Sequence, residues 1–335
     1  MLMFAAEKDA QLREMIRRIW NPPHLFDDAD QTTNDWSSFP DVDALVGGPP
    51  CTPFAPGGPG TGLSHEDGSK IMWLADFCVF KNTQSVAPKV MVMENSKSMM
   101  GKYYFILKQL ATRLKAIGYK VKAEVVNTEN YGIPQHRERT YLIAYRQFKK
   151  RKFRFPRKLP KNHHVQWNKI FQRKNKHGSS LALVNDSAKA RISEALNAVS
   201  KARLKGPVFI DVESSDRFKH WKTNCSPCIT KSRATSGGYY ISPLERIMTT
   251  TEMARLQGFG SWPIDQYKIH CSKTKINGAI GNAMSCNVLE RILPRAFWAC
   301  GLINDIPSDP WENKKYVVSG KAIEDVGHVD LDVSN

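Results

Sequence analysis

The chain of 335 residues is long enough for one large domain or two unequal ones, and its 41% hydrophobic content excludes a disordered tail. Its 49 lysines and arginines outnumber 32 acidic residues, and the net charge of +17 favours a polyanionic partner such as nucleic acid over a merely solvated basic surface. No apolar run approaches the ~18 residues that a membrane-spanning helix needs, so we expect a soluble protein with no membrane partner.

Short apolar runs alternate with amphipathic stretches between residues 42 and 145. This alternation predicts an α/β fold in which crossover helices connect the strands of a parallel sheet. Gly118 is expected to end the second helix. The expected strands are residues 42–46, 89–93, 119–126 and 140–145, and the expected helices are residues 71–80 and 103–117.

The composition changes abruptly after Tyr145, and we place a domain boundary there. Residues 146–161 contain nine lysines and arginines and no acidic residue, interleaved with three phenylalanines. Such a segment can contact phosphates, serve as a nuclear-import signal or form a solvated linker. The interleaved aromatic residues favour phosphate contact.

The rest of the chain divides into three stretches. Residues 148–244 have weak periodicity and predict a smaller irregular module with one helix at 188–204. Periodicity returns at 249–258 and at 276–292, where we expect one core-facing helix packed on the first domain. Residues 306–335 form a polar tail with a loose end. The stripe of this last helix repeats every four residues: Ile276, Ile280, Met284, Val288 and Ile292.

A cysteine lies in a Gly/Pro-rich loop directly after the first expected strand. The loop, residues 47–54, has the sequence GGPPCTPF and comes at the carboxyl end of the sheet, where α/β folds place their sites. Cys51 is a nucleophile if its neighbours stabilise the thiolate, and otherwise a buried cysteine at a tight turn. The loop alone favours neither interpretation.

Two further segments carry reactive or charged groups. Glu94 and Asn95 follow the next strand, so Glu94 can act as a general acid beside Cys51 if burial raises its pKa, whereas Asn95 can alternatively cap a helix. In residues 131–139, alternation along a strand puts Gln135, Arg137 and Arg139 on one face. The two arginines form either a clamp for an anion or carbonyl, or an ordinary solvated face.

These segments, in this order, resemble the cytosine-5 DNA methyltransferase family. Residues 246–259 look like the family's ninth motif, and residues 280–283 look like its tenth. Five ordered matches over residues 47–289 are far more specific than any single one. The resemblance implies a Rossmann-like S-adenosylmethionine-dependent methyltransferase sheet at 1–147 and 245–305, a target-recognition domain at 148–244, and double-stranded DNA as the partner.

The resemblance also implies catalytic roles. Cys51 would attack C6 of a flipped cytosine while Glu94 hydrogen-bonds or protonates N3, so that C5 accepts the methyl group of S-adenosylmethionine. Asn95 would fix the loop and the base. Arg137 and Arg139 would steady the cytosine carbonyl, the thiolate or the backbone phosphates.

Cofactor residues follow from the same resemblance. Residues 4–9 resemble the second motif, whose acid, here Glu7, binds the cofactor ribose. Asp28 fits the acid near the adenine, although Asp27 and Asp30 are rivals. Asn282 would close the cofactor pocket from the far end of the chain.

The family's first motif, a strand and a Gly-rich loop that hold the methionine part of the cofactor, has no match before Glu7 or in residues 317–335. We expect the sequence to be a shortened gene model or a fragment of a longer protein. A chain without this motif lacks half of the cofactor site, so the alternative to an active enzyme is a catalytically silent, DNA-binding fragment.

Seven cysteines without disulfide-framework spacing, and no secretory signal, indicate a reducing intracellular location, the nucleus if the organism is eukaryotic. Cys225 and Cys228 form half a zinc site without a second pair, so no metal is expected. We assign residues 226–231 to base recognition. The sequence CITK at 228–231 is also similar to a stretch in the family's transfer-RNA-methylating branch, which makes transfer RNA an alternative substrate. A monomer is the favoured state.

Overall fold

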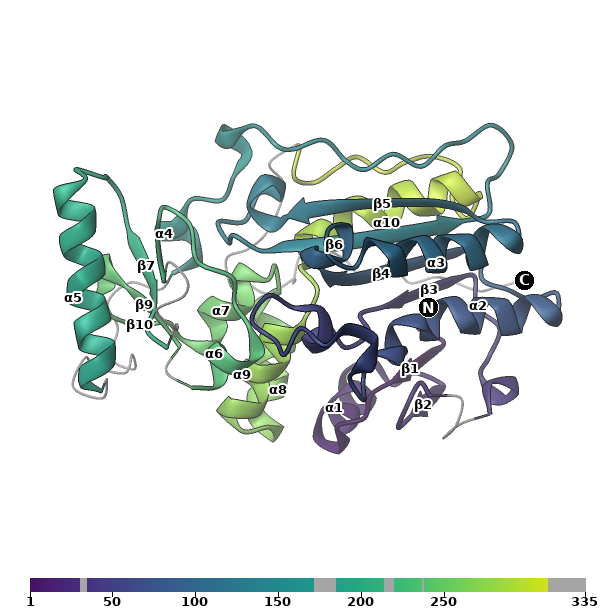
Figure 1. Cartoon of the computed structure of the whole chain (residues 1–335), viewed down its shortest axis with the longest axis horizontal. Coiled ribbons are helices and arrows are strands. Elements are labelled where there is room, and N and C mark those ends of the chain that lie inside the picture. Colours follow the sequence, from purple (N-terminus) through teal and green to yellow (C-terminus); the bar gives the residue numbers. More distant parts are fainter. Residues whose placement is uncertain (31–34, 172–184, 214–219, 237, 313–335) are drawn as a thin grey trace.

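The computed structural model describes residues 1–30, 35–171, 185–213, 220–236 and 238–312 (Figure 1). Its described strands form three sheets, one with two strands and two with four. The larger part of the molecule contains the central sheet with helices on both faces, and the second part extends beyond one end of that sheet (Figure 1). The structural class is α/β, as the sequence predicts.

The central sheet has the strand order β3 (Ala44–Gly47), β4 (Val90–Ser96), β6 (Glu138–Tyr145), β5 (Lys120–Asn127). β3 and β4 are parallel, whereas β6 is antiparallel to both β4 and β5. The expected parallel sheet is therefore correct only for β3 and β4. The connection between β5 and β6, residues 128–137, is too short for a crossover helix, so β6 returns alongside β5 in the opposite direction.

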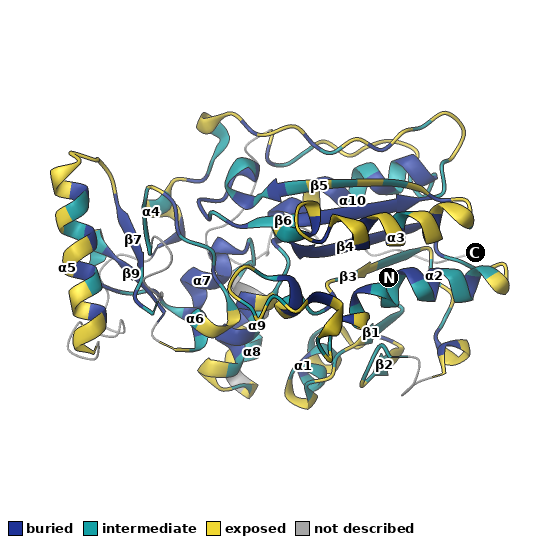
Figure 2. Cartoon of the chain, in the orientation of Figure 1, coloured by how far each residue is buried: buried dark blue, intermediate teal, exposed yellow. Residues whose placement is uncertain are grey.

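Helices cover both faces of this sheet. α2 (Trp73–Thr83) and α3 (Tyr104–Ala116) pack on one face, and α10 (Cys286–Cys300) packs on the other. Consequently all seven residues of β4 are buried (Figure 2). Gly118 follows α3 with a φ of +92°, a left-handed conformation suited to glycine, so the expected end of this helix is confirmed.

The N-terminal segment forms a small parallel unit. β1 (Phe4–Ala6) pairs with β2 (His24–Phe26), and α1 (Ala10–Trp20) connects them. The Asp9 side chain accepts hydrogen bonds from the first backbone amides of α1 and caps it. An aromatic cluster that includes Phe4, Phe39 and Phe77 packs this unit against α2.

The second part of the chain is more regular than the sequence predicts. Its antiparallel sheet has the order β10 (Arg246–Ile247), β9 (Tyr239–Ile241), β7 (Val208–Asp211), β8 (Trp221–Thr223). Two to four residues are too few to produce a recognisable period of two, which is why the sheet was missed. The expected helix is present as α5 (Asp186–Lys201), and α4 (Trp167–Ile170) and α6 (Lys231–Thr235) are short.

The region after β10 is helical. α7 (Thr250–Leu256) confirms the helix expected at 249–258 and is followed by α8 (Ser261–His270) and α9 (Lys273–Asn282). The single helix expected over 276–292 is wrong, because residues 283–285 separate α9 from α10. Ile276 and Ile280 pack in the core of the second part, whereas Val288 and Ile292 pack on the central sheet.

None of the described helices combines the length and apolar character needed to cross a membrane. The first residues of the expected tail pack on the rest of the chain: the Trp311 side chain is buried, and Asp309 pairs with Arg291. Residues 313–335, where the loose end is expected, lie outside the described residues.

Candidate active site

Cys51 and Glu94 lie at the same edge of the central sheet, as expected from the sequence. β3 and β4 are parallel neighbours, with Gly47 opposite Met93, so the loop after β3 emerges beside Glu94. Cys51 ends that loop and directly precedes the short 3-10 helix Thr52–Phe54. Glu94 belongs to β4 itself, which extends three residues further than the sequence predicts.

Asn95 anchors the cysteine loop. Its side-chain amide donates a hydrogen bond of 3.0 Å to the Pro49 carbonyl, and its side-chain oxygen accepts one of 2.8 Å from the Ser96 amide. The helix-capping alternative is wrong, because the 3-10 helix Lys97–Met100 has no side-chain cap. The buried Asn95 therefore fixes the backbone two residues before Cys51.

Two arginines from β6 and the loop before it face Glu94. Arg139 Nε lies 3.2 Å from Glu94 Oε1, and Arg137 Nη2 lies 3.8 Å from the same oxygen. Among the described residues, Glu94 Oε1, Arg137 Nε and Arg139 Nε are buried without a hydrogen-bond partner. Glu94 Oε1 and Arg139 Nε face each other as an ion pair, whereas Arg137 Nε is available for a ligand, because buried polar groups normally have partners.

Arg137 also links the two parts of the chain. Its guanidinium donates to the Ile229 carbonyl at 2.7 Å and to the Ala283 carbonyl at 2.8 Å. Only 2% of its side chain is exposed. The arginine thus connects the central sheet, the segment before α6 and the break between α9 and α10.

Cys228 is a site residue that the sequence analysis missed. Its sulfur accepts hydrogen bonds from Arg139 Nη2 at 3.5 Å and from Arg137 Nη1 at 3.6 Å. The CITK stretch was a signal for this position, but we had assigned it to base recognition. The structure instead places Cys228 at the arginine pair, about ninety residues away in sequence.

The pKa shifts show how these charges oppose one another. Burial and the neighbouring Glu94 raise the pKa of the Cys51 thiol, while Arg139 and Arg137 act in the opposite direction. Burial also raises the pKa of Glu94 against the effect of the same arginines. A protonated Glu94 can donate a hydrogen bond, and its loss of charge makes the Cys51 thiolate easier to form.

The alternation expected in residues 135–139 is confirmed. Gln135 and Arg137 are buried on one face, whereas His136 and Glu138 are partly exposed on the other, 3.7 Å apart. Gln135 donates to the Leu256 carbonyl at 2.7 Å and accepts from the Ile229 amide at 3.0 Å. This residue therefore stabilises the junction that Arg137 also spans.

A second site lies beside the N-terminal unit. A pocket of about 350 Å³ is lined by charged residues from β1–α1, the segment after β2 and the loop before α2. Asp28 lines it as expected, but so do its rivals Asp27 and Asp30. The lining residues are Lys8, Arg13, Asp27, Asp28, Asp30 and Lys70.

The other two expected cofactor residues do not line this pocket. Glu7 follows β1 directly, as an acid ending a strand should, and its carboxylate accepts a hydrogen bond of 2.8 Å from the Asp9 amide. Asn282 is exposed at the end of α9. Their assignment to the cofactor stays a prediction.

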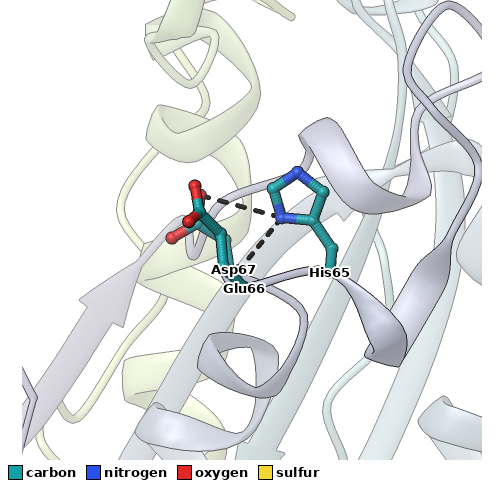
Figure 3. A group of neighbouring side chains, drawn as sticks. All are labelled: His65, Glu66 and Asp67. Carbon is teal, nitrogen blue, oxygen red and sulfur yellow. Dashed lines mark hydrogen bonds and ion pairs between the residues drawn. The ribbon is translucent and has the colours of Figure 1, made fainter.

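Possible metal ligands cluster once in the described part of the chain, at His65, Glu66 and Asp67 (Figure 3). His65 Nδ1 accepts a hydrogen bond of 3.0 Å from the Asp67 amide, and the Asp67 carboxylate pairs with Lys70. The cluster is therefore a turn in which His65 and Asp67 already have partners, and its Glu66 is exposed. Cys225 and Cys228 belong to no such cluster among the described residues.

The residues that resemble the ninth motif join β10 to α7. Arg246 and Glu252 form a buried ion pair of 2.6 Å, and Thr249 and Glu252 form a capping box. Gln257 donates to the Ile280 carbonyl at 2.9 Å, and its side-chain oxygen accepts from Ser285 at 3.1 Å. These contacts hold the α9–α10 break near Arg137.

Both the sequence and the fold are similar to those of known proteins. The sequence matches the C-5 cytosine-specific DNA methylase family over residues 1–298. It is 26% identical over 267 residues to the Type II methyltransferase M.HaeII of Haemophilus aegyptius, covering 76% of this chain and 74% of that protein. The fold is similar to the Entamoeba histolytica methyltransferase EhMeth, with a TM-score of 0.61 and 13% identity over 88% of this chain and 89% of that one. The S. pombe Dnmt2 methyltransferase gives a TM-score of 0.60 and 15% identity over 89% and 91%.

Proposed function

The chain belongs to the C-5 cytosine-specific DNA methylase family, and from that premise we propose that it methylates C5 of a cytosine flipped out of double-stranded DNA. One observation carries this proposal: Cys51 and Glu94 lie at one sheet edge with two arginines against the carboxylate. A nucleophile, a proton donor and two fixed cations are the groups that this chemistry needs. We further propose residues 1–147 and 245–305 as the catalytic domain and 148–244 as the target-recognition domain.

Cys51 is the proposed nucleophile. Its proton passes first to solvent water, and the arginines favour this transfer because they stabilise the thiolate. The thiolate then forms a bond to C6 of cytosine, and the electron pair of the C5–C6 double bond shifts through the ring toward N3. After methylation, a base removes the C5 proton, the S–C6 bond breaks and the thiolate is released.

Glu94 is the proposed acid. Burial raises its pKa, so it can carry the proton that N3 accepts when Cys51 attacks. Arg137 Nε, which has no hydrogen-bond partner, can donate to the cytosine carbonyl, and Arg139, which is paired with Glu94, can stabilise the thiolate. Asn95 acts indirectly. Its side chain donates a hydrogen bond to the Pro49 carbonyl and so holds the loop that presents Cys51.

The pocket beside Asp28 fits part of the methyl donor. Acidic side chains can accept hydrogen bonds from the ribose hydroxyls and the adenine amino group of S-adenosylmethionine, and about 350 Å³ is within the range of small-molecule sites. We assign Glu7, Asp28 and Asn282 to this cofactor. When bound, S-adenosylmethionine supplies the electrophilic methyl group.

A mechanism-based trap tests the proposal. Duplex DNA containing 5-fluorocytosine, incubated with the protein and S-adenosylmethionine, should give a covalent adduct that survives denaturing electrophoresis, because fluorine cannot leave as a cation. Cys51→Ala should abolish the adduct. An adduct that persists in this variant would refute the assignment of Cys51, and no adduct with any substrate would favour a catalytically silent DNA-binding protein.

Transfer RNA is a second candidate substrate. It is supported by the CITK sequence at 228–231, whose cysteine contacts both Arg137 and Arg139. The same trap with transfer RNA containing 5-fluorocytosine separates the two. A stronger adduct with transfer RNA than with duplex DNA would replace the DNA proposal.

A further inference from the structure

A basic groove lies at the end of the central sheet opposite to Cys51. It has a volume of about 330 Å³, and its lining comes from the segment after β6, from α10 and from the residues that follow α10. In Figure 1 this segment leaves the right-hand end of β6 and returns along α10. The lining residues are Lys150, Lys152, Arg154, Arg295, Trp298 and Ile306.

The groove segment begins at the end of the central sheet that lies away from the candidate active site. Arg146 donates its amide to the Lys89 carbonyl at the start of β4, whereas Glu94 and Ser96 lie at the other end of this strand. At ~3.3 Å per residue, the seven residues of β4 span about 20 Å. The groove is therefore separate from the Cys51 edge.

The groove is a fixed part of the fold. Arg151 donates to the Trp298 carbonyl at 3.2 Å and to the Ile303 carbonyl at 2.9 Å, and its guanidinium lies over the rings of Phe148 and Trp298. Phe153 is buried beneath the segment. These contacts hold residues 150–154 against α10 and leave the side chains at alternate positions free to face the solvent.

The cations of the groove are not neutralised by the protein. Within the described part of the chain, no acidic side chain pairs with Lys150, Lys152 or Arg154. Arg295 has one contact at the limit of pairing, 3.9 Å to Glu312. Asp305 precedes Ile306 in sequence but does not line the groove. Clustered like charges repel one another, so an anion that occupies the groove would reduce the electrostatic repulsion between these cations.

We propose that this groove binds the sugar–phosphate backbone of a nucleic acid outside the catalytic site. Lys150 lies in the turn that the Arg151 amide closes on the Phe148 carbonyl, and Lys152 and Arg154 follow it along the segment, so the three cations can contact successive negative charges. Trp298 and Ile306 give the groove an apolar side for a sugar or base. A concave groove with an apolar side suits a linear polyanion better than a flat anionic membrane.

Binding of nucleic acid in this basic groove has a simple consequence. Since none of the groove's lining residues belongs to the Cys51 edge, the groove holds a stretch of nucleic acid other than the target nucleotide. It adds sequence-independent affinity and keeps the protein on the polymer between encounters with a target. The inference goes beyond the proposed function, because phosphate binding here does not require Cys51 to react.

The test measures binding of the full 335-residue chain to a labelled 30-base-pair duplex of dA and dT by fluorescence anisotropy at several salt concentrations. This duplex contains no cytosine, so failure of the methylation proposal cannot affect the result. Replacing two lysines in Lys150→Gln/Lys152→Gln should lower the slope of log K against log salt by about 1.8, or 0.9 per lost phosphate contact.

Two further variants make the result specific. Lys108→Gln/Lys115→Gln removes the same charge from the exposed side of α3, on the other face of the sheet, and should change the slope by less than half as much. Lys150→Arg/Lys152→Arg should keep the original slope. An equal loss in the α3 variant, an unchanged slope in the groove variant, or a loss in the arginine variant would overturn the proposal.

A second experiment tests whether the groove binds an anionic membrane instead of a nucleic acid. The protein is mixed with phosphatidylserine vesicles, and co-sedimentation is compared for the original chain and Lys150→Gln/Lys152→Gln. We expect no difference. A groove variant that loses vesicle binding while its DNA salt slope stays unchanged would overturn the nucleic-acid proposal.

Discussion

Cys51 and Glu94 influence each other's protonation, and this coupling is the central property of the candidate site. The negative charge of Glu94 raises the pKa of the Cys51 thiol, and burial raises the pKa of Glu94 itself. A proton on Glu94 therefore does two things: it removes a charge that opposes the thiolate, and it provides the group that can be donated to N3. Whether Glu94 is protonated or ionised, the positive charges of Arg137 and Arg139 stabilise the Cys51 thiolate.

The first prediction concerns this coupling. In Glu94→Gln the charge that raises the Cys51 pKa is gone, so the pH midpoint for alkylation of Cys51 by iodoacetamide should fall. In Arg139→Gln a charge that lowers the pKa is gone, so the midpoint should rise. Peptide mapping by mass spectrometry isolates Cys51 from the other cysteines. Equal midpoints in the two variants would contradict the coupling.

Glu94→Gln should also lower the rate of methyl transfer. General acid groups typically contribute 10²–10⁴-fold to rate. Methyl transfer by Glu94→Gln should therefore fall by about that factor, although this variant is predicted to form the Cys51 thiolate more readily. A variant that retained full activity would exclude Glu94 as the acid.

The connection between α9 and α10 is where local sequence patterns and the observed elements differ most. Apolar residues continue every fourth position through residues 276–292, so periodicity predicts one helix. Ser285 instead bonds with Thr128 at 2.7 Å, and the Cys286 amide donates to the Gln257 carbonyl at 2.8 Å. These tertiary contacts divide the stripe between two cores, and no local signal indicates them.

Other elements of the fold were accessible from the sequence. The strands and helices between residues 42 and 145 have long periodic segments, and all of them are present within a few residues. The antiparallel direction of β6 was not predictable, because strand direction depends on pairing partners. Cys51, Glu94 and the arginines could be placed together once their order was recognised, but Cys228 joins them through a long-range contact.

Two glycines of α9 provide a prediction about helix packing. A Cβ at Gly281 would overlap the backbone of Thr230 and Lys231, whereas a Cβ at Gly278 would lie 3.3 Å from the flexible Thr235 side chain. Gly281→Ala should lower the free energy of unfolding by about 1–3 kcal/mol, the usual range for overpacking. Gly278→Ala should be neutral or stabilise by up to ~1 kcal/mol, since alanine favours helix.

Urea denaturation followed by circular dichroism measures both variants. Because α9 packs on the segment that contains Cys228 and Ile229, Gly281→Ala should also weaken the trapping of 5-fluorocytosine DNA. Equal stability of the two variants would show that α9 and α6 can separate without cost, contrary to the packing described above.

At the scale of the molecule, the buried Arg137 and a partly exposed ion pair connect the two parts of the chain. Arg137 reaches from the central sheet to the Ile229 and Ala283 carbonyls. Lys275 of α9 pairs with Asp9 at the start of α1, and this pair lowers the pKa of the Asp9 carboxyl. The candidate active site and the junction between the two parts of the chain thus share Arg137, so we expect a change at the junction to alter the candidate site.

The last prediction concerns the energetic coupling between Arg137 and Glu94. Arg137→Met leaves Glu94 buried with one arginine fewer and leaves two carbonyl groups without their donor, so unfolding free energy should fall by about 3–5 kcal/mol. Adding Glu94→Gln removes the charge that lost its partner. The double variant should therefore be more stable than the sum of the single changes by about 1–3 kcal/mol in urea denaturation. Strict additivity would mean that Arg137 stabilises the junction only through the carbonyl groups and that its pairing with Glu94 contributes nothing.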